Sequence, residues 1–275
     1  MIIKRSEIER LSSDVRRIID GEVVDLRDNL EGRLSILKND IHTLAGRLNE
    51  QATTLKNDKI ALADTLADIS HQLKTPLTAM ELMVELLEGA PPEKQAEFRQ
   101  NLRQGLIQTS WLVNSLLKMA KLDSGTVEFN IVETTAKEII NAALQPLAVL
   151  LDIKNQRVEI NGDIAIKCDK NWTAEALTNI IKNASEHSQK DSTIMINVGQ
   201  NPICGWVTVA DMGGGMTTAQ IKNAFKRFDN SQKGTGIGLP LAFAIMQGQN
   251  GDIEIDGGKD GLGATFTLKF YKPFK

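Results

Sequence analysis

The stretch ADISHQLKTPLT, residues 67–78, contains one of the three histidines of the chain and lies within a long amphipathic helical pattern. At about 100° per residue, the apolar residues from Leu66 to Leu87 share one side of the predicted helix, and His71 falls opposite them. We therefore expect its imidazole to face solvent, where it can act as a nucleophile. The alternative is an ordinary surface histidine beside a helix kink at Pro76.

Helical periodicity extends from this stretch in both directions. Upstream, apolar residues recur at steps of three and four, which predicts a coiled coil; they are Leu34, Leu37, Ile41, Leu44, Leu48, Leu55 and Leu62. After a break at residues 89–92, a second helix carries the stripe Phe98, Leu102, Leu106, Thr109, Val113, Leu116 and Ala120. Two such helices form an antiparallel hairpin, and covering both stripes requires dimerisation into a four-helix bundle.

After Gly125 the pattern changes to short β-rich runs that alternate with helical segments, which predicts an α/β sandwich. The predicted strands are 127–131, 157–160, 164–168, 193–198, 206–210, 252–255 and 265–270. The predicted helices lie near 135–151, 170–187, 217–227 and 237–248. The domain boundary is placed near Asp123-Ser124-Gly125.

Composition excludes several classes of protein. A net charge of −3 over 275 residues offers no basic surface for nucleic acid. Cys168 and Cys204 lie far apart without metal-ligand spacing, so we expect reduced, buried thiols. The sequence shows no signal peptide and no apolar run near the ~18 residues that cross a bilayer, so the chain as given is expected to be soluble and cytoplasmic.

Two polar clusters in the second half suggest a nucleotide site. Asn179 and Asn183 are four residues apart on one helix face, and amides can coordinate Mg²⁺ or donate to phosphate. Asp211 ends a predicted strand and can accept from the amine of a purine, while Gly213 and Gly215 let the backbone approach the ring. The alternatives are a surface or capping asparagine pair and a plain glycine turn.

A third cluster, KGTGIGL, leads into a helical run, as is typical of phosphate binding. Its glycines are Gly234, Gly236 and Gly238. The spacing matches neither a dinucleotide-binding fingerprint nor a Walker loop. Just upstream, Lys226 and Arg227 could supply positive charge to a triphosphate, and Phe228 could hold the loop by burying its ring.

In their order, these motifs resemble those of the sensor histidine kinases of two-component systems. SHQLKTPL is similar to the H box, NIIKNA to the N box, DMGGGM and GTGIGL to the two glycine boxes, and FKRF to the F box. Residues 1–59 more loosely resemble a HAMP-type relay segment. The resemblance implies three parts: relay helices 1–59, a dimerisation and histidine-phosphotransfer hairpin 60–124, and a GHKL (Bergerat) ATP-binding domain 125–275.

The resemblance also implies a role for each motif. ATP with Mg²⁺ would bind in the α/β domain, with Asn183 holding the metal, Asn179 supporting it and Asp211 recognising adenine. The other implied contacts are Gly213 and Gly215 with the base, and Lys226, Arg227, Gly234, Gly236 and Gly238 with the phosphates. In a homodimer, His71 would take the γ-phosphoryl group and pass it to a response regulator receiver domain docked at the hairpin.

Two residues depart from the family pattern. Gln72 stands where the family has an acid, and an amide can orient the imidazole but cannot take its proton. Glu186 stands where a lysine is common and would repel a triphosphate unless it points away. Thr75, at the position that the family uses for regulator dephosphorylation, is retained, so phosphatase activity is also expected.

The alternatives to a kinase are a catalytically weak nucleotide-binding scaffold and a GHKL-type ATPase. The sequence does not identify the stimulus, the regulator, or transfer in cis or in trans. It leaves room for an upstream membrane or sensor region, and on that interpretation the chain is the cytoplasmic portion of a sensor kinase.

Overall fold

The computed structural model describes residues 5–20, 22, 24–26, 33–228, 236–258 and 263–272. The chain divides into two compact units, residues 1–67 and 68–275. The first unit contains α1 (Arg5–Ile19) and the N-terminal part of α2 (Arg33–Leu87). Leu11 is buried, whereas most leucines of this part of α2 remain exposed. In the described ranges, no helix combines the length and hydropathy needed to cross a bilayer.

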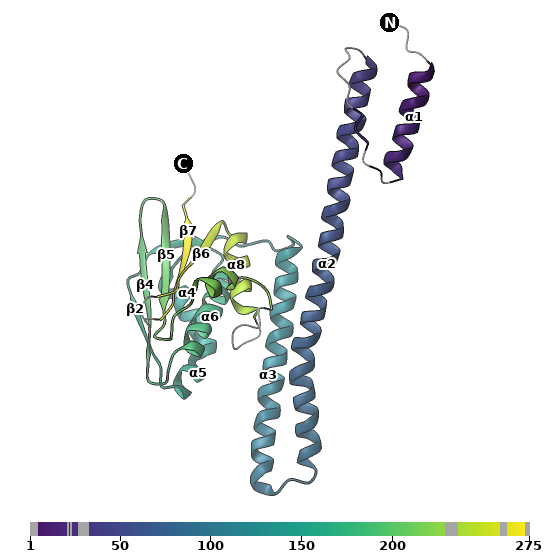
Figure 1. Ribbon diagram of the computed structural model, residues 1–275. Coiled ribbons are helices and arrows are strands. Elements are labelled where there is room, and N and C mark those ends of the chain that lie inside the picture. Colours follow the sequence, from purple (N-terminus) through teal and green to yellow (C-terminus); the bar gives the residue numbers. More distant parts are fainter. Residues whose placement is uncertain are drawn as a thin grey trace. The chain divides into compact units, whose positions relative to one another are not determined.

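In the second unit, the C-terminal part of α2 and α3 (Pro92–Asp123) form the predicted helical hairpin (Figure 1). Proline at the first position of α3 suits a helix start, because its missing N–H has no intrahelical acceptor there. The helices approach closely at Gly105, where a Cβ atom would lie 2.8 Å from Cγ of the buried Met80. α2 continues through Pro76 as one helix.

Each predicted apolar stripe divides between two environments. On α2, Ile69 and Leu73 are half-buried, whereas Leu77 and Val84 are exposed. On α3, Leu106 and Val113 of the predicted stripe are exposed, and so are Ile107 and Leu117, which the stripe did not include. The predicted α3 stripe missed Leu112 and Met119, which are buried because the α/β domain packs on that side of the helix.

The α/β domain contains a five-stranded sheet of order β2-β4-β5-β7-β6, in which only the β2–β4 pair is parallel. The strands of this sheet are β2 (Arg157–Asn161), β4 (Thr193–Gln200), β5 (Cys204–Ala210), β6 (Gly251–Asp256) and β7 (Thr265–Tyr271). A separate two-stranded sheet pairs β1 (Val132–Thr135) with β3 (Ala165–Cys168). The helical elements are α4 (Ala136–Leu144), η1 (Gln145–Leu147), α5 (Ala148–Ile153), α6 (Lys170–His187), α7 (Thr218–Asn223) and α8 (Gly238–Gly248).

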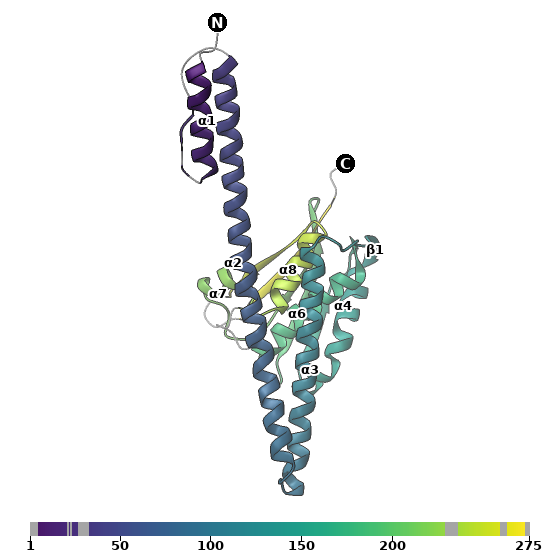
Figure 2. The same ribbon diagram turned by 90° about the vertical axis from the view of Figure 1, so that its right-hand side faces the viewer.

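The core of this domain lies between α4, α6 and α8 and one face of the sheet. Alternate side chains of the central strands point into it, as a half-buried sheet requires; the fully buried ones include Ile194, Ile196, Val207, Val209, Phe266 and Leu268. α8 lies beside α3, as both views show (Figure 2). The α/β prediction is therefore confirmed, and α6 has the predicted bounds.

Two local predictions were wrong. Residues 127–131 form no strand, because the Asn130 N–H donates to Asp169 Oδ2 and the Phe129 ring packs edge-on against Trp172. The pairing strand begins only at Val132. The helix predicted near 135–151 is divided by η1, where Pro146 removes a backbone donor.

Candidate functional site

His71 is exposed on α2, as predicted. One turn later, Thr75 Oγ1 donates a hydrogen bond to the His71 carbonyl oxygen at 3.1 Å. This bond directs the Thr75 hydroxyl at the helix backbone, one turn from His71. The structure thus places an accessible imidazole on the hairpin, with Ile69 and Leu73 packed on another side of the helix.

α6 carries the two asparagines of the predicted N box. The helix begins at Asp169, whose Oδ1 accepts from the Asn171 and Trp172 N–H groups, both at 3.0 Å. Asn179 is buried, and its Nδ2 donates to the Glu175 carbonyl at 2.9 Å. Its Oδ1 lies beside the start of α8, because a Cβ atom on Gly238 would be 3.2 Å from it.

Asp211 follows β5 and is held by backbone donors. The N–H groups of Gly213, at 2.8 Å, and Ala264, at 3.1 Å, both donate to Oδ1. Burial raises the pKa of the Asp211 carboxyl, and the two backbone hydrogen bonds and the nearby His187 partly offset that rise. A Cβ atom on Gly213 would lie 2.7 Å from the His187 carbonyl oxygen, so only glycine fits there.

A hollow of about 50 Å³ lies between α6 and the Asp211 loop. Its lining residues are Asn183, His187, Asp211, Gly214, Gly215, Met216, Gln220 and Ala264. Three predicted site residues therefore meet here: Asn183, Asp211 and Gly215. This space is much smaller than a purine, so the hollow as it stands does not enclose a nucleotide.

His187 borders this hollow, although sequence reasoning gave it no role. The available signal was its spacing, four residues after Asn183 at the end of the same helix, which places both side chains on one face. The sequence analysis considered only the immediate neighbours of His187, and so it missed this relation to Asn183.

The two phenylalanines of the F box pack against different helices. The Phe225 ring stacks on Phe243 of α8 with centroids 4.5 Å apart. Phe228 is buried, as predicted, and packs in a cluster with Leu112 of α3. Its N–H donates to the Gly236 carbonyl at 3.0 Å, and both residues adopt positive φ angles. Gly234 lies outside the described residues.

Arg227 pairs with the hairpin in this structure. Its two terminal nitrogens contact both carboxylate oxygens of Asp123, at 2.7 and 2.6 Å. Lys226 is exposed. The role predicted for these two cations in phosphate binding remains a prediction.

Glu186, the acid that departs from the family pattern, has a cation nearby. Lys182 Nζ lies 3.8 Å from Glu186 Oε1, one turn away on α6. The same ammonium lies 4.1 Å from the centroid of the Trp111 ring on α3. The charge of Glu186 is therefore partly compensated, which weakens the expected repulsion of a triphosphate.

Comparison with known proteins gives two matches in sequence order. Residues 61–125 match the His Kinase A (phospho-acceptor) domain, and residues 168–273 match the family described as Histidine kinase-, DNA gyrase B-, and HSP90-like ATPase. The chain is 32% identical to the Sensor histidine kinase WalK of Bacillus subtilis (strain 168) over 234 residues, which is 76% of this chain and 36% of WalK.

The chain belongs to the sensor histidine kinases of two-component systems. It spans 36% of WalK and 52% of the heme sensor protein HssS of Staphylococcus saprophyticus. The Acinetobacter baumannii histidine kinase AdeS has the same fold, with a TM-score of 0.62 and 22% identity over 73% of this chain and 97% of that one. The ATPase family match also supports ATP binding by the α/β domain.

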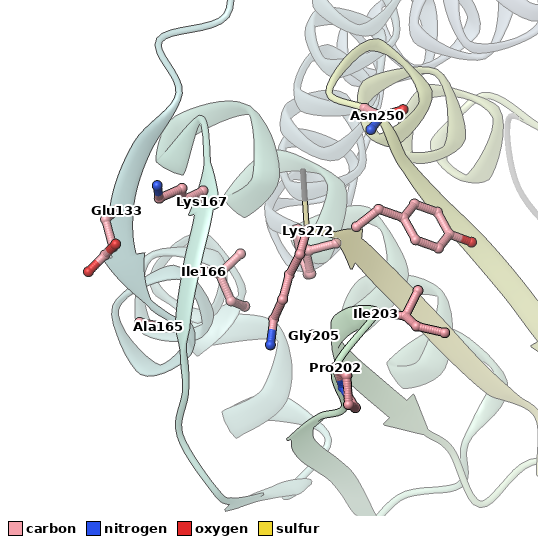
Figure 3. A pocket seen from close by; sticks show the side chains of 11 residues that line it. Glu133, Ala165, Ile166, Lys167, Pro202, Ile203, Gly205, Asn250 and Lys272 are labelled. Atoms are coloured by element: carbon pink, nitrogen blue, oxygen red, sulfur yellow. The ribbon is translucent and has the colours of Figure 1, made fainter. Parts of the chain in front are cut away.

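The protein has a second, larger hollow of about 950 Å³ near the start of β5 and the end of β7 (Figure 3). It is lined by residues of the two-stranded sheet and the β4–β5 turn, and none of the predicted site residues is among them. Lys272 extends into the space between Ile166 and Pro202, but its Nζ donates to Gln200 Oε1 and the Asn201 carbonyl. These hydrogen bonds link Lys272, at the end of β7, to the β4–β5 turn.

Proposed function

We propose that the protein is an ATP-dependent histidine kinase that phosphorylates itself on His71 and transfers the phosphoryl group to an aspartate of a response regulator. The observation that carries the proposal is an exposed histidine on a hairpin, in the same chain as a second domain where Asp211 and Asn183 border one hollow. A nucleophile and a nucleotide site are the two parts that such a transfer needs.

In the transfer to His71, an imidazole nitrogen would form a bond to the γ-phosphorus. The bond from that phosphorus to the bridging oxygen breaks, and ADP leaves with the electron pair. The imidazole N–H proton passes to solvent, because the neighbouring Gln72 amide cannot accept it. This predicts slower self-phosphorylation than an acid at position 72 would allow.

The ATP site is proposed on the chemistry of its residues. Asp211 is fixed through Oδ1, and its carboxylate can accept from the exocyclic amine of adenine. Asn183, supported by Asn179, supplies an amide oxygen suited to Mg²⁺, which would neutralise phosphate charge when bound. The N-terminus of α8 at Gly238 suits the phosphates, with Gly236 just before it.

We also propose that two chains form a homodimer through the hairpin. The exposed apolar residues Leu106, Val113 and Leu117 are seven and four residues apart, which places them on one face of α3. Leu77 and Val84 make a similar exposed face on α2. A second copy would cover these faces in a four-helix bundle.

The proposed protein partner is a response regulator receiver domain. The fold resembles that of the histidine kinase ThkA in a structure of its complex with the response regulator TrrA, with a TM-score of 0.58 and 16% identity over 82% of this chain and 66% of that one. Thr75, one turn from His71, is proposed to support dephosphorylation of the regulator. Residues 1–59 are proposed to relay a signal to the hairpin.

Labelled ATP tests the proposal. We expect the wild-type protein to acquire acid-labile, alkali-stable label, and the His71→Ala variant to acquire none. His42→Ala, which removes a histidine from the same helix, is the matched control and should be labelled normally. Release of free phosphate without labelled protein would indicate an ATPase, and neither product would indicate a non-catalytic scaffold.

A further inference from the structure

β3 has an edge that pairs with no other strand and that borders the larger hollow. Within the described residues, its sheet contains only β1 and β3, so just one side of β3 is paired. Ala165, Ile166 and Lys167 of β3 line the hollow, which lies between this strand and the end of β7 (Figure 3). An unpaired edge presents backbone N–H and C=O groups to which another strand can add.

The register of the β1–β3 pair shows which backbone groups face the hollow. The Ala136 N–H donates to the Ile164 carbonyl at 2.9 Å, so these residues form a hydrogen-bonded pair. Such pairs alternate along an antiparallel ladder, so Ile166 bonds to β1, whereas Ala165 and Lys167 direct their N–H and C=O groups to the opposite edge. Two donors and two acceptors of β3 therefore face the hollow.

These outward groups of Ala165 and Lys167 have no hydrogen-bond partner in the part of the chain that the structure describes. The next outward amide, that of Asp169, is satisfied, because it donates to Gln249 Oε1 at 2.6 Å. The two open residues are about 7 Å apart along the strand, which matches the repeat of a second strand.

The hollow beside this edge is largely apolar. Its apolar lining includes Ile166, Pro202, Ile203 and Phe270. Ile203 and Tyr271 are 65% and 41% exposed, so a guest in the hollow removes apolar surface from water.

The charges around the edge favour an acidic guest. Lys167 forms no ion pair within the described ranges, although Glu133 lies opposite it on β1. Lys272 extends into the hollow, where its Nζ donates only to the neutral acceptors Gln200 Oε1 and the Asn201 carbonyl. A second copy of this edge would bring like charges together, which disfavours pairing between two β3 strands.

We propose that this edge of β3 binds an extended peptide segment of another protein, in which apolar and acidic residues alternate. The backbone of the segment bonds to the outward groups of Ala165 and Lys167. Successive side chains of a strand point to opposite faces, so the apolar residues lie beside Ile166 in the hollow and the acidic residues lie beside Lys167.

Synthetic peptides test the proposal on the full chain. The probe is a fluorescein-labelled, end-capped peptide of four Val-Glu repeats, and fluorescence anisotropy measures its binding. We expect saturable binding, and a block peptide of four valines followed by four glutamates should bind roughly tenfold more weakly. Absence of binding by the alternating peptide, or equal binding of the two, would overturn the proposal.

Methylation of the peptide backbone tests the pairing without any change to the protein. Alternate residues of a strand direct their N–H groups to opposite edges, so N-methyl groups on the glutamates and on the valines block opposite edges. One methylated peptide should keep most of the affinity, and the other should lose roughly tenfold. Similar losses for both would contradict a strand added at one edge.

Substitutions on β3 locate the binding site. Ala165→Pro removes an outward N–H and leaves the β1–β3 hydrogen bonds in place, so binding should weaken roughly tenfold. Ala165→Ser keeps the N–H and is the matched control. Lys167→Glu should weaken binding of the Val-Glu peptide and strengthen that of a Val-Lys peptide, a result that does not require the proline variant to fold. Unchanged preference in Lys167→Glu would count against the proposal.

Hydrogen exchange followed by NMR reports on the individual amides. Saturation with the Val-Glu peptide should slow exchange at Ala165 and Lys167 and leave Ile166, which already bonds to β1, unchanged. Unchanged exchange at both outward amides would place the peptide elsewhere and refute the assignment. None of these measurements involves ATP or His71, so they are independent of the proposed kinase activity.

Discussion

A substitution at Asp211 can test adenine recognition without removing the hydrogen bonds that hold this residue in the fold. Both backbone donors use Oδ1, so Asp211→Asn can keep these bonds while it replaces the second oxygen by an amide NH2 group. We expect the variant to fold and to lose at least tenfold in ATP affinity, because the amide NH2 group donates and cannot accept from the exocyclic amine of adenine. Calorimetric titration with ATP measures the loss, and binding at wild-type affinity would contradict the role given to Asp211.

The raised pKa of Asp211 also predicts a pH dependence. Folding favours the protonated carboxyl, so this contribution to stability is fully present below the unfolded pKa and is lost as pH rises through the folded pKa. The neutral Asp211→Asn side chain avoids that loss. Urea denaturation should find the variant at least as stable as the wild type at pH 7, with a smaller advantage near pH 4.

Sequence reasoning at the residue scale succeeded where one motif carries the chemistry. The outward direction of His71 followed from helix geometry alone, and Asp211, Asn183 and Gly215 do border one hollow. The pairing of Arg227 with Asp123 could not be predicted, because the two residues are 104 positions apart and meet only through tertiary packing.

At the scale of elements, α6 depends on its first residue. Asp169 accepts two N–H groups of the helix through Oδ1 and the Asn130 N–H through Oδ2. Asp169→Ala should lower the free energy of unfolding by about 2 kcal/mol, because it loses the cap and a buried tertiary bond. Asp169→Asn keeps the Oδ1 acceptor and should lose about 1 kcal/mol. Chemical denaturation compares the two, and equal losses would contradict this division.

The same residue explains why element prediction was uneven. The start of α6 is encoded locally by Asp169, and its predicted bounds were correct. The segment 127–131 has a strand-like composition, yet its backbone bonds to Asp169 from 39 positions away. Strand pairing is a non-local choice, so periodicity alone could not place β1 at Val132.

At the scale of the whole molecule, the exposed face of α3 predicts the oligomeric state. Leu117→Asp would place a charge in the proposed dimer interface, and the variant should be monomeric by light scattering at micromolar concentration. Gln108→Asp adds the same charge at an exposed polar position about 180° around α3 from Leu117 and should remain dimeric. If both variants keep the wild-type mass, the dimer does not use this face.

The hairpin followed by an α/β domain was predicted from periodicity and confirmed. The docking of α8 on α3 was not predicted, because an apolar stripe indicates that a helix face is buried but not which element buries it. Leu112 and Met119 were not in the predicted stripe because they are buried by the α/β domain, whose docking was not predicted. The limits predicted for the three domains remain predictions.

The lysine above the Trp111 ring has an optical consequence. Indole emission responds to a nearby positive charge and to contact with water, and this chain has only three tryptophans. With Trp172 and Trp206 replaced by phenylalanine, the remaining tryptophan fluorescence would come from Trp111, at the contact between α3 and the α/β domain. A shift of that emission on addition of nucleotide would report a change at the Lys182–Trp111 contact in real time, without any attached dye.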